Sequence, residues 1–122
     1  MNSPIQTRFL LICHDRSGSN LLRGMLNQNE DVYVIPPLPI FEIIYYYQSI
    51  YGNLEQQSNW HTLIGDIAEL YQANHYPLPV DLSFEDILAA ADARPRTLGG
   101  AVMGVFDLIG EAVRPRALGL KF

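Results

Sequence analysis

The sequence predicts an α/β fold. It starts with a strand, a polar loop and a helix, and the strand is expected to belong to a parallel sheet. The apolar run Arg8–His14 is typical of a strand buried on both faces of such a sheet. A second strand is expected at Val32–Ile35, where Pro36 ends the pattern. Because one helix separates the two strands, a right-handed parallel crossover is the default connection. The helix between them is predicted by apolar residues at helical spacing: Leu21, Leu22, Met25 and Leu26.

A helical region is expected after the second strand. Apolar residues at helical spacing predict four helices, at residues 39–52, 59–74, 84–93 and 98–113. Ser83 and Asp86 approximate a capping box before the third helix, and Thr97 is placed to cap the fourth. The glycines of the fourth helix weaken it and indicate close packing against another helix. After Pro115, residues 117–122 look like the start of another buried strand.

Composition limits the classes of protein that fit this chain. Its 122 residues suit one domain, and 13 acidic against 8 basic residues give a net charge of −5, which argues against a nucleic-acid partner. No apolar run approaches the ~20 residues that span a bilayer, and no signal peptide is recognisable, so a cytoplasmic protein is expected. A single cysteine, Cys13, excludes an internal disulfide, and no two histidines have metal-ligand spacing, so we assign no metal.

The loop between the first strand and the first helix is the most informative stretch. It reads Arg16-Ser17-Gly18-Ser19-Asn20. Free backbone N–H groups and the positive end of a helix dipole favour a phosphate or sulfate at such a position. Gly18 lets the backbone approach the ligand, and Arg16 adds a fixed charge with a forked set of donors. The loop therefore predicts an anion-binding site.

Other motifs of this kind fail on spacing. A Walker A loop needs an earlier glycine and a lysine that are both missing, and a Cys-x5-Arg phosphatase loop needs arginine where Ser19 stands. A dinucleotide fingerprint needs three glycines, and the pentapeptide Gly-x-Ser-x-Gly of esterases does not occur. The simpler alternative is an ordinary strand-to-helix turn, in which Ser19 or Asn20 caps the helix and Arg16 is solvated.

The stretch from Arg8 to Arg23, RFLLICHDRSGSNLLR, resembles the 5′-phosphosulfate-binding strand-loop-helix of sulfotransferases. The resemblance implies a P-loop-like α/β fold that binds 3′-phosphoadenosine 5′-phosphosulfate as co-substrate. Weaker similarity at residues 27–37 and 118–121 brings the covered part to about a third of the chain. By the same resemblance, Arg16 would hold the phosphosulfate and neutralise charge on its bridging oxygen, and the nucleotide would be cradled by Ser17, Gly18, Ser19, Asn20 and Leu21.

The resemblance also implies a division of the chain. Residues 1–38 would form the cofactor unit, residues 39–114 a helical acceptor-side region, and residues 115–122 the start of a further strand. Because a domain of this family needs about 250 residues, we expect the chain to be the N-terminal part of an incomplete domain that does not turn over substrate alone. Its uncovered strands, together with a charged fraction of only 17%, would then allow self-association.

A base must deprotonate the acceptor. Family members often have a glutamate just after the second strand, whereas this chain has prolines there. Glu42 is the nearest carboxylate. Its simpler interpretation is an exposed carboxylate in the first turn of a helix. The aromatic residues from Tyr45 to Tyr71 would wall a pocket for a small-molecule or carbohydrate acceptor with a hydroxyl or amine group, or would simply pack between helices. Two alternatives to a sulfotransferase stay open: a nucleotide-dependent phosphotransferase with an atypical P-loop, and a truncated, inactive fragment.

Overall fold

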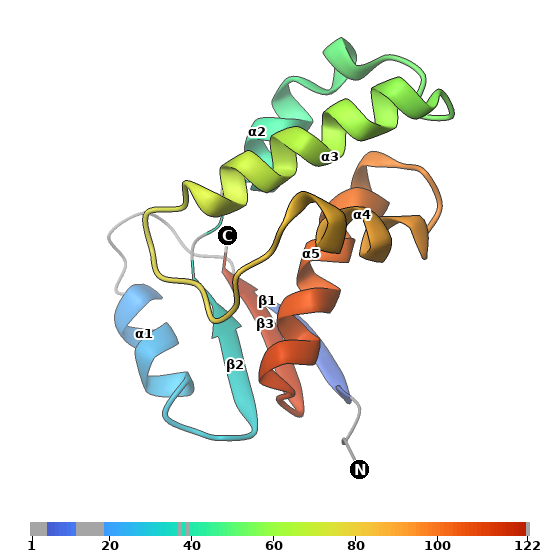
Figure 1. Cartoon of the computed structure of the whole chain (residues 1–122). Helices are drawn as coiled ribbons and strands as arrows, with labels where there is room; N and C mark the ends of the chain where they lie inside the picture. Colours follow the sequence, from blue (N-terminus) through green and yellow to red (C-terminus); the bar gives the residue numbers. More distant parts are fainter. Residues whose placement is uncertain (1–4, 12–18, 37, 39, 122) are drawn as a thin grey trace.

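The computed structural model describes residues 5–11, 19–36, 38 and 40–121. Strands β1 (Thr7–Leu11), β2 (Val32–Ile35) and β3 (Ala117–Lys121) form one sheet with the order β1-β3-β2 (Figure 1). Both β1 and β2 pair with β3 in parallel, so the predicted α/β fold with a parallel sheet is confirmed. The two N-terminal strands are not neighbours, however, because the distant strand β3 lies between them.

The helices follow the predicted order with one difference. They are α1 (Ser19–Leu26), α2 (Ile40–Tyr46), the 3₁₀ helix η1 (Gln48–Tyr51), α3 (Gln57–Gln72), α4 (Phe84–Asp92) and α5 (Leu98–Val113). The single helix expected over residues 39–52 is therefore wrong, since α2 ends at Tyr46 and a tighter turn follows. That turn places the buried Tyr51 where its hydroxyl donates to Asp66 Oδ2 of α3 at 2.7 Å.

The core lies where α3, α4 and α5 meet and where α5 crosses the sheet (Figure 1). Its fully buried side chains on these helices include Trp60, Leu63, Ile64, Ile67, Ile87, Val105 and Ile109. Gly104 of α5 is the point of closest approach to α4, because a Cβ built there would lie 3.0 Å from the backbone N of Ala91. The prediction that a glycine of this helix allows close helix packing is confirmed at this position.

Short-range polar contacts fix the starts of α4 and α5 as predicted. Ser83 Oγ accepts from the Asp86 N–H at 3.1 Å, and Asp86 Oδ2 accepts from the Ser83 N–H at 3.0 Å, which completes the capping box. These hydrogen bonds lower the pKa of the Asp86 carboxyl below its usual value. Thr97 Oγ1 accepts from the Gly100 N–H at 2.9 Å and caps α5.

Longer-range polar contacts join the edges of the core. Asp107 of α5 accepts from Arg94 Nε at 2.6 Å and from Arg94 Nη2 at 2.9 Å, and Arg8 of β1 lies 3.3 Å from the same carboxylate. Trp60 Nε1 donates to Asp92 Oδ1 at 2.9 Å, which ties α3 to the end of α4. The first strand, α5 and the segment before it are thus held by one carboxylate.

One prediction about an apolar element is wrong. A strand buried on both faces was expected at residues 8–14, yet β1 forms one edge of the described sheet and Leu10 is 58% exposed. Leu22 and Met25, two of the apolar residues whose spacing predicts α1, are exposed on that helix. Within the described part of the chain, β1 pairs with β3 on one side, and no strand pairs with its other side. None of the helices in that part is long and apolar enough to cross a bilayer.

Candidate functional site

The carboxyl ends of the three strands meet at one edge of the sheet. Leu11, the last residue of β1, is in register with Lys121 of β3, and Ile35, the last residue of β2, is in register with Leu120. Residues 12–18 connect this edge to α1, and residues 36–39 connect it to α2. Ligands of open parallel sheets bind at the carboxyl ends of the strands, so this edge is the candidate site.

The predicted nucleotide-binding residues lie at the start of α1 or just before it. Ser19, Asn20 and Leu21 form the first turn of α1. Arg16, Ser17 and Gly18 directly precede that turn and lie outside the described residues, as do Cys13 and His14. The backbone arrangement around the motif is therefore a parallel strand on one side and a helix N-terminus on the other, which is the context that favours an anion.

The end of α1 is fastened to the sheet by one side chain. Asn27 Oδ1 accepts from the Val34 N–H at 2.6 Å, and Asn27 Nδ2 donates to the Val34 carbonyl at 3.2 Å. The Asn27 amide group thus bonds both backbone polar groups of Val34, as a neighbouring strand would. Since Asn27 directly follows α1, these bonds set the direction in which the helix leaves the candidate site.

Three polar side chains influence one another at β2: Tyr33 of β2, Arg23 of α1 and Tyr71 of α3. Arg23 of α1 has a buried Nε without a hydrogen-bond partner among the described residues. Burial raises the pKa of Tyr33 on β2, against the opposing effect of the nearby Arg23 charge. Burial, followed by the influence of Tyr33 and Asp81, raises the pKa of Tyr71 to about 12. Both phenols are therefore neutral hydrogen-bonding groups at physiological pH.

The predicted base Glu42 is in the first turn of α2, which follows the carboxyl end of β2. Its side chain is exposed and has no hydrogen bond or ion pair within the described part of the chain. This placement is compatible with both interpretations of the residue, a carboxylate beside the site and a solvated one at a helix start.

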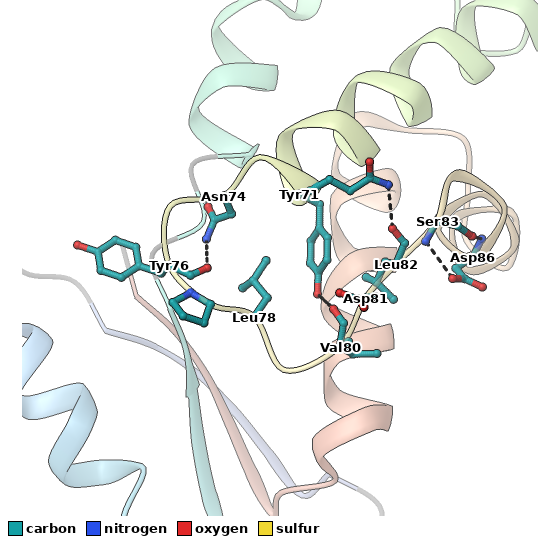
Figure 2. A pocket seen from close by; sticks show the side chains of 11 residues that line it. Tyr71, Asn74, Tyr76, Leu78, Val80, Asp81, Leu82, Ser83 and Asp86 are labelled. Carbon is teal, nitrogen blue, oxygen red and sulfur yellow. Dashed lines mark hydrogen bonds between the residues drawn. The ribbon is translucent and has the colours of Figure 1, made fainter.

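Two of the cavities in the described part of the chain bear on the candidate site. The larger, of about 590 Å³, is open to solvent and is lined by the segment between α3 and α4 and by Tyr71 (Figure 2). A smaller, mostly apolar hollow of about 230 Å³ lies between the sheet and α5, against Phe9, Ile35 and Phe106. The consecutive tyrosines Tyr45, Tyr46 and Tyr47 line neither cavity and are 56%, 78% and 52% exposed. Of the aromatic residues expected around an acceptor, Tyr71 is one that does line a cavity.

Comparisons with family models, with curated proteins and with solved structures returned no match to this chain. Within the residues that the structure describes, no group of three or more histidine, cysteine, aspartate or glutamate side chains is arranged to hold a metal.

Sequence reasoning missed three features of this region. The Asn27 bonds to β2, the unpartnered Nε of Arg23 and the cavity beside Tyr71 all depend on contacts between separate elements. A hint was available for the first, because Asn27 ends the predicted helix just before a strand. For the cavity, the sequence Tyr76-Pro77-Leu78-Pro79 is typical of a turn, but it does not show that the turn lines a cavity.

Proposed function

We propose that this chain binds 3′-phosphoadenosine 5′-phosphosulfate and belongs to a sulfotransferase that moves the sulfuryl group to an acceptor hydroxyl or amine. The observation that carries the proposal is the motif Arg16-Ser17-Gly18-Ser19-Asn20 between a parallel strand and the start of a helix. Strand, loop and helix in this order place backbone N–H groups and a positive dipole at the carboxyl edge of the sheet. In the proposed site, Arg16 would add a guanidinium to these groups.

The chemistry asks for positioning and charge rather than covalent work by the protein. The acceptor oxygen attacks sulfur, so a new O–S bond forms while the bond from sulfur to the bridging oxygen breaks. The bridging oxygen keeps the electron pair and leaves with adenosine 3′,5′-bisphosphate, and the acceptor proton passes to a base. We assign the developing charge on the bridging oxygen to Arg16 and the proton to Glu42.

Calorimetric titration of the chain with the phosphosulfate nucleotide tests the proposal. Arg16→Ala should weaken binding about tenfold to a hundredfold, because a charged hydrogen bond contributes about 1.5–3 kcal/mol. Arg116→Ala is the matched control. It removes the same charge just before β3, at the amino ends of the strands and away from the candidate site. Equal affinity of wild type and Arg16→Ala would overturn the assignment.

A parallel titration with ATP and Mg²⁺ separates the proposal from a phosphotransferase. The loop has no Walker lysine, and Asn20 stands where a hydroxyl would bind the metal ion. The phosphosulfate nucleotide should therefore bind more tightly than ATP with Mg²⁺, and the reverse order would favour the phosphotransferase. Glu42→Gln should leave the nucleotide affinity unchanged, because Glu42 is assigned to the acceptor proton.

A further inference from the structure

The segment between α3 and α4 forms a cavity of small-molecule size. Residues 73–83 connect the end of α3 to α4 (Figure 1), and the cavity of about 590 Å³ is lined by this segment and by Tyr71 (Figure 2). Ligand pockets range from about 300 to 1,000 Å³ and combine apolar walls with a few polar groups. Leu78 and Leu82 supply apolar wall here, and Asp81 is among the polar groups.

Hydrogen bonds within the segment determine its shape and occupy several side-chain donors. The Tyr71 hydroxyl donates to the Val80 carbonyl, and Gln72 Nε2 donates to the Leu82 carbonyl at 3.2 Å. Asn74 Nδ2 likewise donates to the Tyr76 carbonyl at 3.0 Å. The phenol proton and one amide proton of each side chain are therefore already used by the backbone. A ligand that brings its own donors suits this lining better than one that needs them.

The charge of the lining is negative. Asp81 and Asp86 belong to it, and lysine, arginine and histidine do not. Asp86 Oδ2 accepts from the Ser83 N–H, and the lowered pKa of this carboxyl keeps it ionised at neutral pH. Asp81 is exposed and has no hydrogen bond or ion pair within the part of the chain that the structure describes. An anionic ligand would meet repulsion here, and a cation would find an unpaired carboxylate.

We propose that this cavity binds a small hydroxylated ammonium compound, such as an amino sugar, with the ammonium group at Asp81 and the ring against Tyr71 and Leu78. An ammonium group would donate to the carboxylate of Asp81, and the apolar faces of a sugar ring match the apolar side chains of the lining. This inference rests on the proposed function only for the role of the compound, which would be the sulfuryl acceptor. Its chemistry is opposite to that of the nucleotide, which is anionic and is assigned to the start of α1.

The position of the cavity fits an acceptor. Tyr71 lines it, and Tyr33 of β2 contributes, after burial, to the raised pKa of Tyr71. Tyr33 belongs to the strand whose carboxyl end is part of the candidate site. Leu78 and Val80 also pack against the main core, so the cavity wall is held to the body of the domain.

The test is a nuclear magnetic resonance titration of the full chain with glucosamine, glucose and glucuronate, three probes that share one ring and differ in charge. At slightly acidic pH, where the amine is protonated, glucosamine should shift the backbone amide signals of residues 71–83. Glucose should bind more weakly and glucuronate most weakly. Equal binding of all three, or shifts confined to other residues, would overturn the proposal.

Two charge-matched variants sharpen the test. Asp81→Asn should weaken glucosamine binding about twofold to fivefold, the effect of one exposed ion pair, and leave glucose binding unchanged. Glu85→Gln removes the same charge from the exposed side of α4 outside the lining, and it should leave both affinities unchanged. Equal effects of the two variants would mean that only net charge matters, which would contradict a site at Asp81. Circular dichroism shows whether each variant keeps its helix content.

The nucleotide titration distinguishes failure of this inference from failure of the proposed function. The phosphosulfate nucleotide is assigned to residues 16–21, and glucosamine to residues 71–83. Nucleotide binding without glucosamine binding would leave the proposed function standing and remove this inference. Glucosamine binding without nucleotide binding would keep the cavity as an ammonium site and remove the sulfotransferase assignment.

Discussion

Replacing Gly104 by alanine should destabilise the protein, although alanine is the better helix former. A Cβ at this position would lie 3.0 Å from Ala91 N and 3.2 Å from Ala91 Cα, well inside the ~3.5–4.0 Å at which heavy atoms pack. Both atoms belong to the backbone of α4, so relief requires the two helices to separate. Overpacking of this kind costs about 1–3 kcal/mol, and the gain in helix propensity offsets about 1 kcal/mol. The net loss should be about 0–2 kcal/mol.

Gly99 of the same helix provides the matched control. Apart from its chain neighbours and the backbone of its own helix, nothing lies within 4 Å of a Cβ built there, so Gly99→Ala should stabilise the protein by about 0.4–1 kcal/mol through the unfolded state. Urea unfolding followed by circular dichroism measures both variants against wild type. Gly104→Ala should unfold at a lower urea concentration than wild type or at the same one, and Gly99→Ala at a higher one. A Gly104→Ala protein as stable as Gly99→Ala would refute the close contact between α4 and α5.

Three further predictions concern single polar groups. Asn27→Ala should destabilise the protein by about 1–3 kcal/mol, because the Val34 N–H loses its acceptor, and should speed hydrogen exchange of that amide; unchanged exchange would contradict the clamp. Asp107→Asn should lower stability by about 1 kcal/mol in low salt and less in high salt, since the contact with Arg94 is partly exposed; a loss independent of salt would argue against an ion pair. Tyr71 has its pKa raised from 10.0 to about 12 in the folded state, so it adds stability below pH 10 that is lost as the pH rises through about 12. Tyr71→Phe should flatten the loss of stability over that range, and an unchanged slope would show that another group causes it.

Features set by neighbouring residues could be predicted from the sequence. Ser83 caps α4 through Asp86, three residues away, and Thr97 caps α5 through Gly100 in the same way. The strand at Ala117 was also predicted, because proline and polar residues separate it from the preceding helix. The residues involved lie within a few positions of each other, so the local sequence is enough to predict these features.

Features set by distant contacts could not be predicted. The order of the strands depends on β3, which is more than eighty residues from β2, and its place between β1 and β2 leaves no local signature. The break after α2 depends on the bond from Tyr51 to Asp66, which is fifteen residues away. For the candidate site, the motif from Arg16 to Asn20 was visible in the sequence, whereas the cavity at Asp81 arises only when the segment folds back on Tyr71.

The central claim is that an anionic phosphosulfate nucleotide binds at the start of α1. Backbone amide signals recorded during addition of 3′-phosphoadenosine 5′-phosphosulfate test it most directly. The signals of residues 19–21 should shift with saturation, and those of residues 98–100, at the start of the capped helix α5, should not. The same shifts should disappear in Arg16→Ala. No response at residues 19–21, or an equal response at both helix starts, would contradict the claim.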